Sequence, residues 1–90
     1  MDKVTEEILL ITQEECAEVT QAISKVFRFG IDAEHKGVTN LEHLEEEVGD
    51  LLCMIDLLVE RNIVRYGKVK NAQRKKLEKL KQWSSIGETP

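Results

Sequence analysis

The chain has 90 residues and a mass of 10.3 kDa, which is the size of one small domain. Apolar residues make up 41% of it and charged residues 33%, a mixture too apolar for a disordered chain. The longest apolar run, residues 51–55, is far shorter than the roughly 20 residues of a membrane helix. The N-terminal residues lack a secretory-signal pattern and the cysteines lack zinc-finger spacing, so we expect a cytoplasmic protein with reduced thiols.

Charge is divided unevenly along the chain. Residues 1–64 carry 15 acids and 5 bases, whereas residues 65–90 carry 8 bases and 2 acids. The basic stretch is a feature of nucleic-acid-binding proteins, but the acid-rich remainder and a pI near 5.2 argue against that class. We expect instead a solvated helix face, or a basic arm that reaches an acidic partner or phosphates.

A long first helix is predicted over residues 4–29, with Asp2 as its N-cap and Gly30 just beyond its end. Side chains on one face of this segment recur at alternating steps of four and three residues. The predicted core stripe consists of Val4, Ile8, Ile11, Glu15, Glu18, Ala22, Lys25 and Phe29. Residues 31–38 are polar and contain a glycine, which is typical of a loop.

A second helix is predicted from Thr39, which forms a capping box with Glu42, to about Tyr66 before Gly67. A third helix is predicted over residues 68–83. Its apolar stripe consists of Val69, Ala72, Leu77, Leu80 and Trp83. We expect residues 1–83 to form one helical domain and residues 84–90 to form a flexible C-terminal tail.

No segment alternates with period two, so the sequence predicts an all-α protein. Between residues 51 and 59 the second helix is apolar on every side except at Asp56, and such a helix must be covered on several sides. A helix over residues 4–29 is about 39 Å long, whereas a compact chain of this size has a radius of gyration near 12–13 Å. We therefore expect long antiparallel helices of two chains to form a four-helix-bundle core, with the C-terminal helix added to it.

Acidic residues interrupt both long helical stripes. Glu15 and Glu18 lie three residues apart, and Glu47 and Asp50 repeat that spacing ahead of the apolar part of the second helix. Removing an unpaired carboxylate from water costs several kcal/mol, a large share of a domain stability of about 5–15 kcal/mol. Lys25 is the only clear basic candidate on the stripes, so divalent cations are the economical counter-charge. An all-carboxylate set favours Mg²⁺ or Mn²⁺.

Other interpretations of these acids are open from spacing alone. Either pair by itself is common on a solvated helix face, although two pairs on apolar stripes of consecutive helices are much rarer. A ferritin-like di-iron site requires Glu-x-x-His pairs, and no glutamate stands three residues before His35 or His43. That absence argues against oxygen chemistry and for a redox-silent Mg²⁺ cluster.

The acids also form a longer motif. Residues 14–18 read Glu-Glu-Cys-Ala-Glu, and after 28 further residues the chain reads Glu-Val-Gly-Asp at 47–50. Over residues 8–74 the chain resembles the MazG-type, all-α nucleoside triphosphate pyrophosphatases, whose signature is Glu-Glu-x-x-Glu … Glu-x-x-Asp. The resemblance implies a Mg²⁺-dependent, oligomeric helical protein. Together with the helix pattern and the carboxylate set, we expect a homodimer or dimer-of-dimers tetramer, with Mn²⁺ as a substitute metal. It also implies cleavage of a nucleoside triphosphate between the α- and β-phosphates, giving a monophosphate and pyrophosphate.

Site roles follow from the resemblance by position. The metal ligands would be Glu15, Glu18, Glu47 and Asp50. Glu14 and Glu15 are the candidate catalytic residues, and Glu14 either orients the attacking water or is a surface acid. Lys25 lies two turns past Glu18 on the core stripe, where a lysine is hard to explain without an anion. The candidate phosphate-binding residues are Lys25, Lys68, Asn71 and Arg74. The last three resemble a Lys-x-x-Asn-x-x-Arg pattern often seen after the second motif, but a solvated basic face would have the same composition.

Several other side chains have expected positions. Cys16 and Cys53 are predicted to be small core residues, and Trp83 is predicted to be a packing anchor. Phe27 and Phe29 are expected to pack in the core, with contact to a nucleobase as the second interpretation. His35 and His43 are expected to be exposed, in or beside the loop between the first two helices.

Two other functions are compatible with the sequence. Phosphoribosyl-ATP pyrophosphatase has a similar length and a related carboxylate arrangement, but it usually carries Ala-Asp and then a histidine after its second glutamate. Here Val48 and Gly49 precede Asp50, which weakens that assignment. The non-enzymatic alternative is a helical dimerisation module whose acids pair across the interface with Lys25, Arg28 or Arg61, and which requires no metal.

Overall fold

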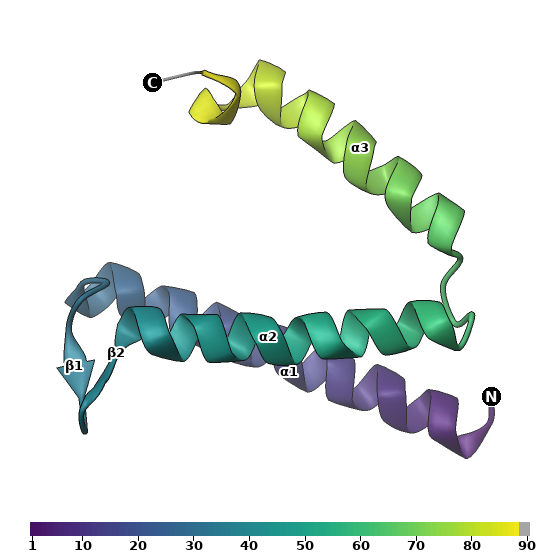
Figure 1. The fold of residues 1–90 in the computed structure, drawn as a ribbon, viewed down its shortest axis with the longest axis horizontal. Helices are drawn as coiled ribbons and strands as arrows, with labels where there is room; N and C mark the ends of the chain where they lie inside the picture. The colour runs from purple at the N-terminus through teal and green to yellow at the C-terminus, as the bar shows by residue number, and fades with distance from the viewer. Residues whose placement is uncertain (89–90) are drawn as a thin grey trace.

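The computed structural model describes residues 1–88, which form three α-helices and a small hairpin. Helix α1 (Lys3–Phe29) and helix α2 (Asn40–Glu60) are antiparallel and lie side by side, joined by strands β1 (Glu34–His35) and β2 (Val38–Thr39). Helix α3 (Tyr66–Trp83) diverges from this pair at an open angle (Figure 1). The prediction of an all-α fold is confirmed.

Both ends of α1 are formed as the sequence predicts. The Asp2 carboxylate accepts a hydrogen bond from the Thr5 backbone N–H at 2.7 Å, which caps the helix N-terminus. Gly30 ends the helix at φ 100°, a conformation that favours glycine, and its N–H donates to the Val26 carbonyl at 2.9 Å. These two caps fix where α1 begins and ends.

The connection between α1 and α2 is more ordered than the predicted loop. Strands β1 and β2 pair antiparallel, with Glu34 opposite Thr39 and His35 opposite Val38. Lys36 and Gly37 form the turn with φ values of 54° and 80°, the positive values that a tight hairpin turn requires. The predicted capping box is confirmed, since Thr39 and Glu42 exchange hydrogen bonds at 3.0 and 3.1 Å.

Helix α2 ends at Glu60, so the predicted continuation to Tyr66 is wrong. The Arg61 N–H donates to the Leu57 carbonyl, and Asn62 then turns the chain at φ 56°. Asparagine tolerates this left-handed conformation better than most residues. The β-branched Ile63 and Val64 follow, and both donate to the Leu58 carbonyl, which closes the helix end.

Packing of α1 against α2 buries a stripe that differs from the predicted one at every second position. The stripe shares Ile8, Glu15 and Ala22 with the prediction, and these are buried or half-buried. Four residues after each of these, however, the half-buried residues are Thr12, Val19 and Val26. The predicted stripe residues Val4, Ile11, Glu18, Lys25 and Phe29 are exposed. The seven-residue spacing of the shared positions is therefore retained, but the contact face is rotated toward the valines.

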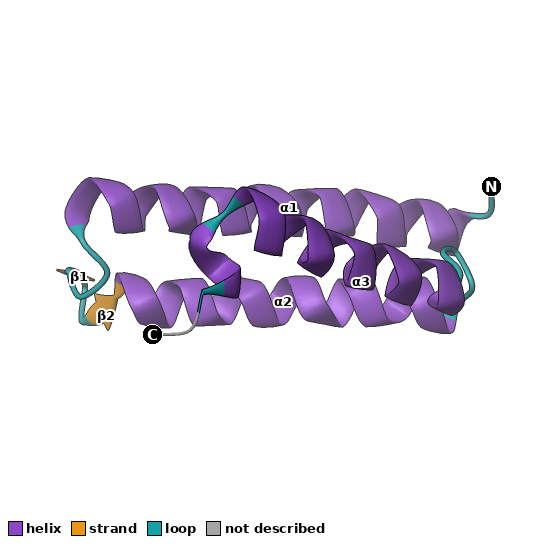
Figure 2. Cartoon of the chain, turned by 90° about the horizontal axis from the view of Figure 1, so that it is seen from above, coloured by secondary structure: helices purple, strands orange, loops and turns teal. Residues whose placement is uncertain are grey.

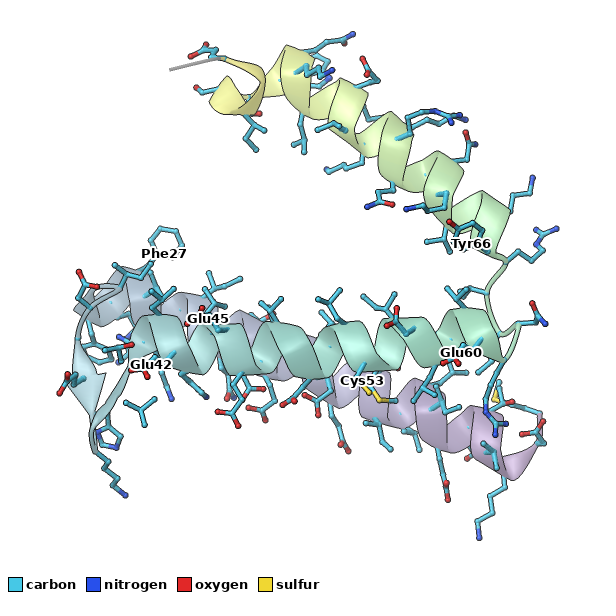
Figure 3. All side chains as sticks on the ribbon, in the orientation of Figure 1. Phe27, Glu42, Glu45, Cys53, Glu60 and Tyr66 are labelled. Carbon is cyan, nitrogen blue, oxygen red and sulfur yellow. The ribbon has the colours of Figure 1, made fainter. Side chains whose placement is uncertain are left out.

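Much apolar surface remains exposed in the single chain. Its radius of gyration is 16.1 Å, compared with about 12 Å for a compact chain of this length. Phe27 projects from α1 on the side where α3 lies (Figure 3) and is 86% exposed, and Trp83 is 81% exposed. Phe29, Cys16 and Cys53 are also exposed. The predicted core positions of these five side chains are therefore wrong for the single chain.

Viewed from above, α3 passes over the α1–α2 pair (Figure 2) and, after Trp83, is followed by the short 3₁₀ helix η1 (Ser85–Gly87). The predicted tail thus begins with a helical turn, and residues 89–90 lie outside the described part. Among residues 1–88, no helix has an apolar stretch that could cross a membrane.

Candidate metal centre

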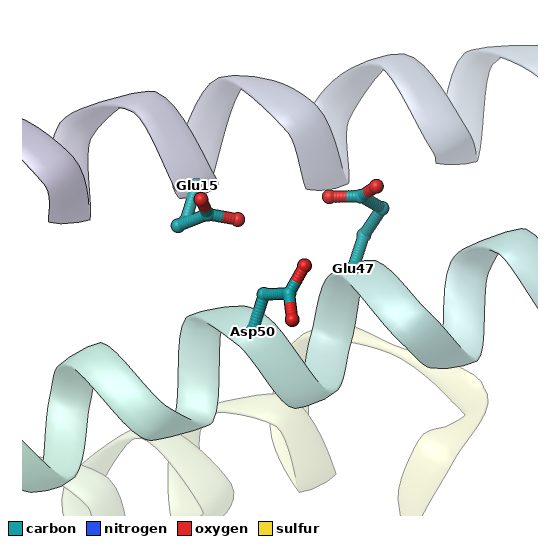
Figure 4. Close-up of side chains that lie close together, drawn as sticks. All are labelled: Glu15, Glu47 and Asp50. Carbon is teal, nitrogen blue, oxygen red and sulfur yellow. The ribbon is translucent and has the colours of Figure 1, made fainter.

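Three carboxylates meet between the two long helices. Glu15 comes from α1, and Glu47 and Asp50 come from α2, with all three side chains directed toward one another (Figure 4). One oxygen from each carboxylate lies within 4.8 Å of the others. Glu47 is 9% exposed, although it carries a charged group, and Glu15 is half-buried. We call these three residues the acidic cluster.

Helix geometry explains why these acids converge. Glu47 and Asp50 are three residues apart, so one turn of α2 presents both on one face. Glu15 lies on the buried stripe of α1 between Ile8 and Ala22, and the antiparallel packing of the helices brings it opposite them. Flanking apolar contacts therefore hold like charges together that would otherwise separate.

The electrostatics of the acidic cluster are unfavourable without a counter-ion. Partial burial raises the pKa of the Glu15 carboxyl, and the negative charges of Asp50, Glu47, Glu18 and Glu14 raise it further, in decreasing order. The first two of these charges belong to the acidic cluster itself. A cation bound between the carboxylates would attract all three of them, which favours the ionised form of Glu15 and lowers its pKa.

Two of the predicted acidic site residues lie beside the cluster rather than in it. Glu18 and Glu14 are exposed on α1, and neither contributes an oxygen to the group of three. Both are close enough for their charges to affect the pKa of Glu15. Glu18 is displaced because the α1 contact face passes through Val19 instead. The acidic surface therefore extends outward from the cluster along α1.

A histidine that the sequence prediction placed in solvent contacts the acidic cluster. His43 ends the first turn of α2, and its Nε2 is 3.2 Å from Oε1 of Glu47. Its side chain is 29% exposed, so the prediction of an exposed His43 is wrong, whereas His35 is exposed as expected. The spacing of four residues between His43 and Glu47 was the available signal, because such pairs are neighbours on a helix.

An open hollow of about 820 Å³ lies at the hairpin end of the helix pair. Its lining includes Lys25, Phe29, Val38, Asn40, His43 and Glu46. His43 also contacts Glu47, so this hollow adjoins the acidic cluster. Lys25 is exposed, so its predicted position in the core is wrong, but the residue lines the hollow.

The three predicted phosphate-binding residues of α3 share one flank of that helix. Asn71 is half-buried, and its Oδ1 accepts a hydrogen bond from Nη2 of Arg74 at 2.7 Å. Lys68 is exposed one turn before Asn71. Because α3 diverges from α1 and α2 (Figure 1), this structure does not bring these residues together with the acidic cluster.

The acidic cluster has the chemistry of a site for a hard divalent cation. Its ligands are all carboxylate oxygens from two rigid helices, the donor type that Mg²⁺ and Mn²⁺ favour over zinc. Side-chain hydrogen bonding or ion pairing to the cluster, within residues 1–88, is limited to the contact of His43 with Glu47. Most of the carboxylate acceptor capacity is therefore unused by the protein itself.

Comparison with protein-family models gives a match over most of the chain. Residues 3–83 match the family model described as the MazG nucleotide pyrophosphohydrolase domain, which includes α1, the hairpin, α2 and α3. Neither the curated proteins nor the solved structures gave a match.

Proposed function

Because the chain belongs to the MazG nucleotide pyrophosphohydrolase domain family, we propose that it hydrolyses nucleoside triphosphates between the α- and β-phosphates in a Mg²⁺-dependent reaction. The products are a nucleoside monophosphate and pyrophosphate. The observation that supports this most directly is the acidic cluster, in which three carboxylates converge from two helices. A polyanionic substrate cannot approach these acids unless cations first neutralise them.

The acidic cluster would hold the metal through Glu15, Glu47 and Asp50, with Glu18 as a further ligand beside it. Bound Mg²⁺ supplies charge neutralisation of the phosphates and lowers the pKa of a coordinated water. In the reaction the water oxygen forms a bond to the α-phosphorus, and the bond from that phosphorus to the bridging oxygen breaks. Pyrophosphate leaves with the electron pair, and a nearby carboxylate, Glu14 or Glu15, accepts the proton of the water.

The nucleoside would occupy the hollow next to the acidic cluster. Phe29 and Val38 offer apolar surface there, and Lys25 offers a positive charge for a phosphate. With the nucleoside in the hollow, its phosphates would extend past His43 toward Glu47 and Asp50. Both ends of the substrate would then be bound by the same pair of helices.

We propose further that the working protein is a homodimer or a dimer of dimers. Helix α3 carries Lys68, Asn71 and Arg74 away from the acidic cluster of its own chain (Figure 1). The exposed apolar side chains on α1 and α2, together with the radius of gyration of 16.1 Å, indicate surface that a second copy can cover. In such an assembly the basic face of one α3 can approach the acidic surface of another chain.

The proposed reaction is tested with a panel of canonical and modified nucleoside triphosphates and Mg²⁺. Products are separated and identified, and pyrophosphate is expected as the first product together with the monophosphate. Orthophosphate as the first product would contradict cleavage between the α- and β-phosphates. Complete inactivity toward the panel, with and without metal, would instead favour the dimerisation module.

A further inference from the structure

Glu47 is the most constrained acid of the site. It is 9% exposed and faces two further carboxylates, Glu15 and Asp50. Repulsion between these groups favours side-chain rotamers that move the Glu47 carboxylate away from the others. A neighbouring group that holds the side chain in its inward position would oppose this tendency.

The His43 side chain is placed to do this. Its Nε2 lies 3.2 Å from Oε1 of Glu47, one turn away on the same helix, and the two side chains are only 29% and 12% exposed. An imidazole that carries a hydrogen on Nε2 presents a donor group at this distance from the carboxylate oxygen. A carboxylate has two oxygens, so the contact at Oε1 leaves Oε2 free for a further ligand.

Helix α2 fixes the position of the imidazole. His43 follows immediately after the capping box of Thr39 and Glu42, which anchors the first turn of the helix. The neighbouring Asn40 is 8% exposed and donates its side-chain amide to the Gly30 carbonyl at 2.8 Å, which ties this turn to the end of α1. His43 therefore projects from a turn of α2 that the capping box and Asn40 anchor.

We propose that His43 is a positioning residue for Glu47, which orients this carboxylate for metal binding through the contact of Nε2 with Oε1. The inference rests on the proposed metal-dependent function. A polar partner in contact with a ligating carboxylate restricts its direction, and loss of such a partner typically reduces metal affinity or activity by about 10- to 100-fold. His43 acts through Glu47 and requires no contact with the phosphates.

The test compares the full-length wild-type chain with His43→Ala and His43→Gln. Glutamine retains an amide N–H donor that can reach four residues along the helix, whereas alanine has none. Glu45→Gln, an exposed acid on the same helix outside the acidic cluster, is the control. The measurements are Mn²⁺ affinity from the free-Mn²⁺ paramagnetic resonance signal, thermal stability in EDTA, and kcat and KM for nucleotide.

In His43→Ala we expect Mn²⁺ affinity to fall by about 10- to 100-fold, with kcat at limiting metal falling in parallel. In His43→Gln most of the affinity should be restored, which a purely structural loss would not produce. Glu45→Gln should bind Mn²⁺ like the wild type. Because stability is followed in EDTA, a folding defect is recognised separately from weakened metal binding.

Two results would overturn the role of His43 and leave the proposed function in place. One is unchanged Mn²⁺ affinity in a folded His43→Ala variant. The other is a raised KM for nucleotide at unchanged Mn²⁺ affinity, because His43 would then contact the substrate in the adjoining hollow. If the wild type itself binds no Mn²⁺ and hydrolyses no nucleotide, the proposed function fails, and the role of His43 fails with it.

Discussion

Glu15 on α1 and Glu47 on α2 present carboxylate oxygens within 4.8 Å of each other across the contact between the two helices. Both lie on the face of their helix that packs against the other, at positions where apolar residues are usual. The contact between α1 and α2 therefore places like charges together at the expense of stability. Proteins tolerate such an arrangement mainly at functional sites.

Removal of one of these charges should maintain or raise stability while it lowers metal binding and turnover. In Glu47→Gln the repulsion with Glu15 and Asp50 is reduced, so the melting temperature in EDTA should be equal to or above that of the wild type. Metal affinity and turnover should fall by more than about a hundredfold. Loss of a metal ligand should reduce them more than loss of a residue, such as His43, that only contacts the ligand. Circular dichroism melts and pyrophosphate release measure the two effects. Normal turnover in this variant would show that the acidic cluster is not the active site.

The buried amide of Asn40 should contribute strongly to stability. It donates to the Gly30 carbonyl at 2.8 Å and, more weakly, to the Lys25 carbonyl at 3.4 Å. Asn40→Ala removes two hydrogen bonds at the junction of α1 and α2, each worth about 0.5–1.5 kcal/mol, so the free energy of unfolding should fall by about 1–3 kcal/mol. Urea denaturation measures the loss. Asn71→Ala, whose partner Arg74 is exposed, should change stability by less than about 0.5 kcal/mol, and an equal effect of both variants would contradict the importance of this junction.

The capping carboxylate of Glu42 should give stability a defined pH dependence. Hydrogen bonds from the Thr39 backbone N–H and hydroxyl hold the pKa of Glu42 below its ordinary value of 4.5. The folded state thus stabilises the ionised form, and this contribution is present above pH 4.5 and is lost as the pH falls through the lower pKa of the folded state.

Glu42→Gln should therefore melt at a lower temperature than the wild type at neutral pH, and the difference should shrink as the pH falls below 4.5. Thermal melts across a pH series at constant ionic strength measure this difference. Glu45→Gln is the control, since no side-chain hydrogen bond to Glu45 is found among residues 1–88. A difference that is independent of pH would contradict an ionised cap.

Self-association should depend on the exposed apolar face of α2. Leu52 is 54% exposed in the single chain, and a glutamate there would introduce a charge into the proposed contact between copies. We expect the wild type to have a multiple of 10.3 kDa by light scattering and Leu52→Glu to shift toward 10.3 kDa. Val38→Glu, at a similarly exposed hairpin position, should keep the wild-type mass. A monomeric wild type would contradict the proposed assembly.

Local chemistry made much of the fold predictable from the sequence. Asp2, Gly30 and the Thr39–Glu42 capping box define helix ends through hydrogen bonds within a few residues, so they can be read without knowledge of the packing. The spacing of Glu47 and Asp50 likewise determined that both carboxylates share one face of α2. The approach of Glu15 to this face followed from two helices joined by a short connection.

Only the tertiary structure decided which side of each helix is in contact. On α1, stripes through Val19 and Val26 or through Glu18 and Lys25 both satisfy the helical period, and packing against α2 selected the valines. The same selection turned His43 inward beside Glu47 and placed Lys25 in the lining of the hollow. Helical periodicity determines the spacing between residues on one face of a helix. Which face is buried depends on the neighbouring helix, so the sequence pattern of one helix alone cannot specify it.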